Sequence, residues 1–350
     1  MMATAKSQKV EEQSAEDAPP ADTPEVFAAK LLAAAQRVDP GIDGIENVGR
    51  VSAGATLQTF ALDVMKGSER IPLILRRSPG GRANAALSLE DEAAIISSVA
   101  RQGIEVPKVW HVLRAEDQLG EGFLMERIEG ETVPRRIHRM VAKEGTAERL
   151  TRQLGRALAR LHSVDLSELP EALTRTPIET QLDNLAIQAR REGAQPRPVF
   201  ELALKWLRKR IPEPAPPRLL HGDFRIGNVI VGPEGLRSIL DWEIAHIGDP
   251  AEDLAWMQIP PWRFGELQKP VGGVGRAEDF YAAYAEEAGR DVDPERVRFF
   301  RVLGSLRWGV STAGMVEWLR GHDPSVERAM IARRASENEI DLLRAMTGKD

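Results

Sequence analysis

The sequence predicts an α+β protein in which a small, mainly antiparallel sheet precedes a larger, mainly helical part. Up to residue 128, apolar and polar residues repeatedly alternate with the period of β-strands. Beyond Gly130 the period becomes helical, and Leu150, Leu154, Leu158 and Leu161 share one helix face. The change of period divides the chain into an N-terminal lobe of residues 23–128 and a C-terminal lobe of residues 129–350.

The N-terminal lobe is expected to contain five strands, which cover residues 45–51, 57–64, 71–76, 106–113 and 122–128. A helix before them starts at Thr23-Pro24, where a capping hydroxyl is followed by a proline at the first helical position. A second helix lies between the third and fourth strands; it opens at a capping box beginning with Ser88 and stops at Gly103. Residues 1–22 have almost nothing to bury and are expected to form a disordered tail.

Composition narrows the functional classes. The chain has 350 residues, no cysteine and a formal net charge of −6. It therefore offers no thiolate metal site or cysteine nucleophile and no bulk attraction for nucleic acid or an anionic membrane. No apolar run approaches the roughly 18 residues that a membrane-spanning helix requires, and the first residues lack the apolar centre of a signal peptide. We expect a cytoplasmic enzyme that binds neither nucleic acid nor membrane; its oligomeric state stays open.

Two short motifs carry the chemistry. Residues 221–228 read HGDFRIGN, and residues 239–243 read ILDWE after a predicted β-hairpin. Phosphoryl transfer requires a carboxylate that orients the acceptor and hard oxygen ligands for magnesium. Asp223 and Asn228 lie in one loop, and the hairpin folds Asp241 back beside Asn228. The alternative is a plain β-hairpin with turn-forming Asp, Gly and Asn residues.

These motifs resemble those of the aminoglycoside phosphotransferase and choline kinase superfamily, which is related to protein kinases. The similarity is greatest to the branch that includes kinase domains fused to acyl-CoA dehydrogenases, and it covers about residues 45 to 320. The resemblance implies a two-lobed protein-kinase-like fold, ATP as co-substrate and Mg²⁺ as cofactor. It also implies Asp223 as the catalytic residue, Asn228 and Asp241 as magnesium ligands, and structural roles for His221, Asp249 and Asp253.

In the N-terminal lobe the resemblance places Arg76 where kinases have their phosphate-binding lysine. Glu92 matches the ion-pair partner of that lysine. Arginine is a departure from the wider kinase pattern, because it offers a planar fork instead of a point charge. Strand alternation allows only one of Arg76 and Arg77 to face the nucleotide, and which one does so stays open. The alternative is a pair of arginines on a solvated face.

Two further segments match nucleotide-binding positions. The loop that contains Ser52, Gly54 and Thr56 corresponds to the turn that covers the nucleotide, although one glycine alone fits an ordinary β-turn equally well. The Glu126 carbonyl and the Ile128 N–H correspond to the backbone groups that bind adenine in a kinase hinge. The apolar residues around them also fit an ordinary buried strand.

The predicted function is phosphorylation of a hydroxyl group on a small molecule, and a metabolic or acyl-type acceptor is favoured. An aminoglycoside acceptor is a weaker alternative, because residues 265–350 hold 15 acidic and 13 basic residues and are not strongly acidic. A second alternative is a catalytically weak nucleotide-binding pseudokinase, suggested by Arg76 and the glycine-poor loop. Protein kinase activity fits less well, because DWE replaces the DFG segment. The choice between ATP and GTP stays open.

Overall fold

The computed structural model describes residues 22–52, 57–81, 85–191, 196–315 and 326–349. The chain forms two compact units, one of residues 1–97 and 107–127 and the other of residues 98–106 and 128–350. The C-terminal end of one helix and the segment after it, residues 98–106, thus belong to the second unit. The expected disordered tail lies outside the described residues except for Asp22.

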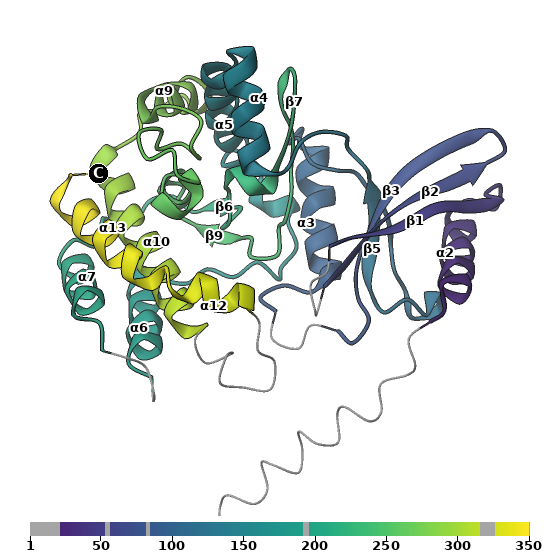
Figure 1. Ribbon diagram of the computed structural model, residues 1–350, viewed down its shortest axis with the longest axis horizontal. Helices are drawn as coiled ribbons and strands as arrows, with labels where there is room; N and C mark the ends of the chain where they lie inside the picture. Colours follow the sequence, from purple (N-terminus) through teal and green to yellow (C-terminus); the bar gives the residue numbers. More distant parts are fainter. Residues whose placement is uncertain (1–21, 53–56, 82–84, 192–195, 316–325, 350) are drawn as a thin grey trace, which may run out of the picture. The chain divides into compact units, whose positions relative to one another are not determined.

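The first unit is built on one antiparallel sheet, as the sequence predicts (Figure 1). The strand order is β1-β2-β3-β5-β4, and all four neighbouring pairs are antiparallel. Its elements are α2 (Pro24–Val38), β1 (Gly44–Ser52), β2 (Gln58–Lys66), β3 (Glu69–Ser78), α3 (Leu89–Arg101), β4 (Val109–Val112), a 3-10 turn (Ala115–Asp117) and β5 (Glu121–Glu126).

Local sequence signals set the ends of both helices. The Thr23 hydroxyl caps α2 by accepting a hydrogen bond from the Val26 N–H at 3.4 Å. The Ser88 hydroxyl accepts from the Asp91 N–H at 3.0 Å at the start of α3. The apolar face of α2 packs on the sheet in one core cluster with Leu62, Leu73 and other strand residues.

The second unit is mostly helical. Its helices are α4 (Pro134–Glu144), α5 (Ala147–Leu161), α6 (Ile178–Ala189), α7 (Pro198–Arg208), α8 (Ala251–Trp256), α9 (Ala277–Ala288), α10 (Pro294–Gly314), α12 (Val326–Ala332) and α13 (Ala335–Thr347), with 3-10 turns at Leu166–Glu168, Ile226–Asn228 and Pro260–Arg263. Helix α5 packs against α9, and the long helix α10 packs against α7, α8 and α13. None of the helices in the described part of the chain has both the length and the apolar character that crossing a bilayer requires.

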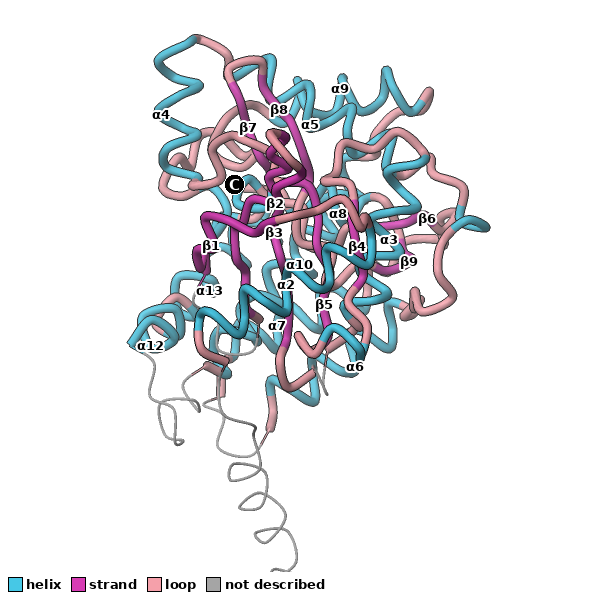
Figure 2. The backbone as a smooth tube through the Cα atoms, turned by 90° about the vertical axis from the view of Figure 1, so that its right-hand side faces the viewer, coloured by secondary structure: helices cyan, strands magenta, loops and turns pink. Residues whose placement is uncertain are grey.

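Two small antiparallel pairs interrupt the helices and hold the segment with the predicted motifs (Figure 2). The pair β7 (Val229–Gly232) and β8 (Gly235–Ile239) is the predicted hairpin. The other pair joins β6 (Arg218–Leu220) to β9 (His246–Gly248). The sequence analysis did not predict β9, because three residues are too few to show a period.

Candidate active site

The loop that carries Asp223 joins β6 to β7 through a tight turn at Gly222. Gly222 has a φ of +80°, and a Cβ atom there would lie 2.5 Å from the Ile244 carbonyl oxygen. Both the backbone conformation and the close approach therefore require glycine. This turn directs the chain from the buried strand β6 into the loop in which Asp223 is partly exposed.

Asp253 on α8 anchors this turn from beneath. Its buried carboxylate accepts hydrogen bonds from the backbone N–H groups of His221 at 2.8 Å and Gly222 at 2.9 Å. Burial alone would raise the pKa of Asp253, but hydrogen bonds from His162 and from the His221 backbone outweigh it and hold the pKa below its ordinary value. The structural role predicted for Asp253 is confirmed.

His221 joins the catalytic loop to the end of β8. Its Nδ1 accepts a hydrogen bond from the Asp223 N–H at 3.2 Å, and its Nε2 lies 2.9 Å from the Leu240 carbonyl oxygen. Because a backbone N–H can only donate and a carbonyl can only accept, these partners assign the ring proton to Nε2. Both ring nitrogens are engaged with backbone, which confirms the structural role predicted for His221.

Three donors fix the carboxylate of Asp223. The Trp256 indole donates to Oδ1 at 2.6 Å, whereas the Asn228 amide and the Arg225 guanidinium donate to Oδ2 at 2.7 and 3.0 Å. A carboxylate offers about four acceptor positions. The three donors occupy both positions of Oδ2 and one of Oδ1, so one acceptor position is left on Oδ1.

The side-chain amide of Asn228 has a defined orientation. Its Nδ2 donates to the Asp223 carbonyl oxygen at 3.0 Å as well as to the carboxylate, and both partners can only accept. The amide oxygen is therefore the atom turned away from Asp223. A buried amide oxygen is one of the hard ligands that magnesium accepts, so Asn228 fits the predicted metal site.

The hairpin brings Asp241 next to Asn228, as the sequence predicts. Val229 pairs with Ile239 across the ladder, and the Leu240 N–H donates to the Asn228 carbonyl oxygen at 2.8 Å. Asp241 follows directly with a φ of +69°, an unusual conformation for a residue with a side chain. The described residues hold no group of three or more His, Cys, Asp or Glu side chains with metal-binding geometry. A magnesium ion here would have two protein ligands, with phosphate and water completing the octahedron, which is usual for nucleotide-bound magnesium.

Aromatic rings and two arginines lie near the carboxylate of Asp223. Trp256, Trp262 and Trp308 form a cluster in which neighbouring ring centroids lie 5.6 and 4.8 Å apart. The Arg307 guanidinium lies 4.3 Å from the Trp256 ring centre, and that of Arg225 lies 4.8 Å from the Trp262 ring centre. No local sequence pattern predicts the hydrogen bond from Trp256 to Asp223, because the two residues lie 33 positions apart in the chain.

In the first unit, β3 sends its two successive arginines to opposite faces of the sheet. Arg76 lies with Nε 3.5 Å from Oε1 of Glu92 on α3, and both side chains are mostly buried. Arg77 instead lies over the Phe27 ring of α2. The predicted ion pair with Glu92 is thus formed by Arg76 and not by Arg77. Which of the two arginines contacts phosphate stays a prediction.

The remaining predicted nucleotide contacts lie at the ends of strands. Ser52 ends β1, whereas Gly54 and Thr56 lie outside the described residues. Glu126 ends β5, and its backbone N–H donates to the Lys108 carbonyl at 2.9 Å. Two residues later, the Ile128 N–H donates no hydrogen bond to any residue that the structure describes.

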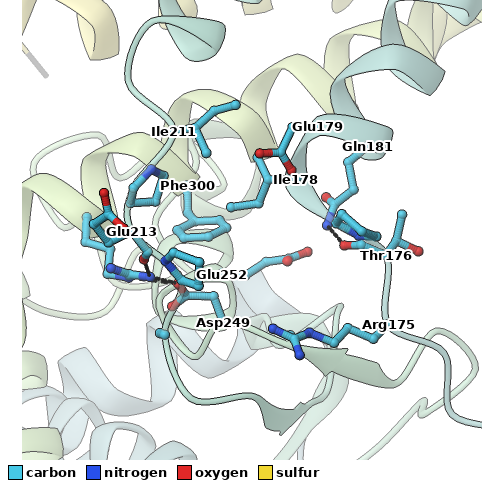
Figure 3. A pocket seen from close by; sticks show the side chains of 16 residues that line it. Arg175, Thr176, Ile178, Glu179, Gln181, Ile211, Glu213, Asp249, Glu252 and Phe300 are labelled. Carbon is cyan, nitrogen blue, oxygen red and sulfur yellow. Dashed lines mark hydrogen bonds and ion pairs between the residues drawn. The ribbon is translucent and has the colours of Figure 1, made fainter.

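A separate cavity of about 500 Å³ lies in the second unit (Figure 3). Arg175, Asp249, Glu252 and Phe300 line it. Glu252 is buried and binds Arg307 at 2.8 Å, and Arg307 in turn donates to the Gly222 carbonyl at 3.2 Å. The cavity wall is thereby connected to the turn that precedes Asp223.

Residues 47–300 match the sequence profile of the phosphotransferase enzyme family. The chain is 30% identical over 331 residues to acyl-CoA dehydrogenase family member 11 of Gallus gallus, covering 87% of this chain and 41% of that protein. It is 25% identical over 305 residues to the Pongo abelii protein of the same name, covering 81% of this chain and 38% of that protein. The chain thus spans less than half of the length of these relatives.

Solved structures share the fold. A Ralstonia eutropha protein assigned as an aminoglycoside phosphotransferase superposes with a TM-score of 0.71 at 19% identity, covering 91% of this chain and 98% of that one. A choline/ethanolamine kinase family protein from Mesorhizobium loti gives a TM-score of 0.60 at 19% identity, with 92% and 97% covered. A thermostable mutant of aminoglycoside phosphotransferase APH(4)-Ia, in complex with ADP and hygromycin B, gives 0.58 at 15% identity, with 86% and 95% covered. These similarities establish the protein-kinase-like α+β fold.

Proposed function

Because the chain belongs to the phosphotransferase enzyme family, we propose that it transfers the γ-phosphoryl group of ATP to a hydroxyl group of a small molecule. One observation carries this proposal. Three donors hold the Asp223 carboxylate and leave an acceptor position on Oδ1, while the β7–β8 hairpin brings Asn228 and Asp241 together beside it. A plain β-hairpin with turn-forming residues would not require this arrangement of side chains.

Asp223 has the catalytic role in this proposal. The acceptor hydroxyl donates its hydrogen bond to Oδ1, which aims the oxygen lone pair at the γ-phosphorus. The proton passes to the carboxylate as the new O–P bond forms and ADP leaves. Arg225 holds Oδ2 and keeps the carboxylate from rotating away. Asn228 and Asp241 would hold Mg²⁺, which when bound neutralises charge on the phosphate oxygens.

The first unit supplies the proposed nucleotide contacts except for Ile128, which belongs to the second unit. Arg76 binds phosphate, and Glu92 holds its guanidinium in place. The backbone groups of Glu126 and Ile128 bind the adenine ring, and the segment Ser52–Thr56 covers the phosphates. The nucleotide complexes among the solved structures of the same fold support this assignment, since one of them contains ADP. GTP stays the alternative, because another similar enzyme was solved with GDP.

The surroundings of Asp223 favour an apolar, neutral or anionic acceptor. Arg225 pairs with Asp223 and Arg307 with Glu252, so these two carboxylates are already neutralised and attract a polycationic aminoglycoside less. In the tryptophan cluster Trp256 and Trp262 are buried, and the partly buried Trp308 offers aromatic surface to an apolar body. The names of the relatives point the same way, since they are acyl-CoA dehydrogenase family members. We therefore favour a hydroxylated acyl-type or other metabolic compound over an aminoglycoside.

The purified chain tests this function directly. It is incubated with Mg²⁺ and ATP or GTP across panels of hydroxy acids, hydroxyacyl thioesters, choline-like alcohols and aminoglycosides, and products heavier by one phosphoryl group are sought by mass spectrometry. Asp223→Asn is the control, because it keeps the size of the side chain and removes the base. Phosphorylated product that forms with the wild type and not with this variant supports the proposal. Nucleotide binding without turnover on any panel would favour the pseudokinase.

A further inference from the structure

A second cavity lies on the face of the sheet opposite the Arg76–Glu92 pair. It measures about 620 Å³ and is bounded by α2, strands β1, β2 and β3, and the turn at residues 118–120. All of its lining belongs to the first unit. None of the residues assigned to nucleotide binding or catalysis lines it, so it is distinct from the proposed active site.

Arg77 is the central charge of this cavity. Its Nε donates to the Gln58 side-chain oxygen at 3.0 Å, and its Nη1 donates to the Leu119 carbonyl at 3.2 Å. Its guanidinium carbon lies 4.3 Å from the ring centre of Phe27 and 5.5 Å from that of Phe60. All four partners are neutral. Within the described part of the chain, no carboxylate forms an ion pair with Arg77.

The guanidinium still has donors to offer. It carries five N–H groups in a planar fork, and the bonds to Gln58 and Leu119 use one from Nε and one from Nη1. Burial lowers the pKa of Arg77 below its ordinary value; the charge of Asp22 opposes this shift, and the positive charge of Arg50 adds to it. A partly buried cation of this kind is stabilised by an anion that accepts two of its N–H groups side by side.

Most of the other charged side chains that line the cavity are positive, like Arg77. Lys30 and Arg50 also face the cavity, whereas Asp22 is its single acidic side chain among the described residues. Asp22 lies 2.6 Å from Lys30 and forms an ion pair with it. Phe27, Phe60 and Leu119 supply apolar walls next to Arg77.

We propose that this cavity is a binding site for a small organic oxyanion, in which a phosphate or carboxylate group pairs with Arg77 and an apolar body lies against Phe27 and Phe60. The anionic group satisfies the donors that Gln58 and Leu119 leave over. The aromatic rings exclude bare inorganic ions in favour of ligands with a ring or short chain. The site serves a ligand other than the phosphoryl donor and acceptor.

Phenyl phosphate is a suitable probe, because it combines both features. Its binding to the full chain is measured by isothermal titration calorimetry with Mg²⁺ and a non-hydrolysable ATP analogue at saturation, so that the nucleotide site is occupied. We expect Arg77→Gln to weaken binding by about tenfold or more, because a charge-assisted bidentate pair is lost. Arg101→Gln is the matched control, since it removes the same charge from an exposed position on α3. Equal affinity in wild type and Arg77→Gln, or an equal loss in Arg101→Gln, overturns the proposal.

Arg77→Gln also removes the contacts of the guanidinium with the Phe27 and Phe60 rings, which contribute to the stability of the fold. Two more measurements therefore separate an effect on binding from an effect on stability. Arg50→Gln changes an exposed side chain of the same cavity and should weaken phenyl phosphate by about threefold through charge alone. In ¹H–¹⁵N spectra of the wild type, the probe should shift the amides of Leu119 and Gly120. Full affinity in Arg50→Gln, or shifts confined to the second unit, contradicts the assignment. Inorganic phosphate and benzyl alcohol should each bind more weakly than phenyl phosphate, and equal binding by either refutes the two-part ligand.

Discussion

The indole Nε1 of Trp256 lies 2.6 Å from Oδ1 of Asp223 and donates a hydrogen bond to it. Trp256 ends α8, the helix whose Asp253 also holds the turn before Asp223. One short helix therefore positions both the backbone and the side chain of the catalytic loop. The indole fixes the rotation of the carboxylate and so determines where the free acceptor position of Oδ1 points.

We expect Trp256→Phe to lower kcat by about tenfold while the affinity for nucleotide stays unchanged. Phenylalanine keeps an aromatic ring against Arg307 and loses the N–H, so the cost is that of one hydrogen bond to a charged group. The measurement is steady-state kinetics together with nucleotide titration.

Trp262→Phe is the matched control for this prediction. The Trp262 indole N–H is buried and has no acceptor among the described residues, so its removal should leave kcat nearly unchanged. If the two variants lose the same activity, the tryptophans act only by packing and Trp256 does not position Asp223.

Replacing Asp241 tests the metal site. Asp241→Ala should abolish turnover and remove the Mg²⁺ dependence of nucleotide binding, because one of the two proposed protein ligands is lost. Glu234→Gln in the turn of the same hairpin is the control, since Glu234 is exposed and pairs with Arg237. Survival of both turnover and metal-dependent binding in Asp241→Ala would show that the metal is held elsewhere.

Local patterns in the sequence predicted most of the fold. The five strands, the Thr23 cap of α2 and the hairpin between Asn228 and Asp241 each depend on residues near one another in the chain. The Arg76–Glu92 pair was predicted by resemblance and confirmed by the structure. Strand alternation alone could show only that Arg76 and Arg77 face opposite ways.

The sequence did not predict contacts between side chains that lie far apart in the chain. His162 is the C-cap residue of α5, a position at which the helix dipole favours a histidine. It is also buried, 3.3 Å from Asp253 and 2.9 Å from the Tyr284 hydroxyl, which are 91 and 122 residues away in the chain. The hydrogen bond from Trp256 to Asp223 likewise joins residues that lie far apart in the chain. Helical periodicity indicates that such side chains are buried, but it does not indicate which polar groups they meet.

Arg76 tests how the first unit holds phosphate. We expect Arg76→Ala to weaken nucleotide binding by about tenfold or more, because a charged hydrogen bond to phosphate is lost. Arg76→Lys should recover part of the loss, since lysine restores the charge next to Glu92 without the fork. Arg77→Gln is the control on the same strand, because that side chain faces α2. If Arg77→Gln loses as much affinity for nucleotide as Arg76→Ala, the assignment of Arg76 is wrong.

The pair of His246 and Glu252 should make stability depend on pH. His246 Nε2 lies 3.6 Å from Glu252 Oε2, and the Glu252 side chain is buried. Burial alone would lower the pKa of His246, but the Glu252 carboxylate outweighs it and holds the pKa above the ordinary value of 6.5. The folded protein therefore binds the imidazole proton more tightly than the unfolded chain does. The resulting stabilisation is fully present below the ordinary histidine pKa and is lost as the pH rises through the raised value.

His246→Asn should accordingly lose more free energy of unfolding, relative to wild type, at about pH 5.5 than at about pH 8.5. Urea unfolding at the two pH values measures this difference. The Glu252→Gln variant should show the same trend, because it removes the partner that raises the pKa of His246. His138→Asn is the control, since that ring contacts the Gly272 carbonyl and pairs with no carboxylate among the residues that the structure describes. A loss in His246→Asn that is independent of pH, or that grows as the pH rises, would mean that the imidazole is held by packing and that its charge contributes nothing.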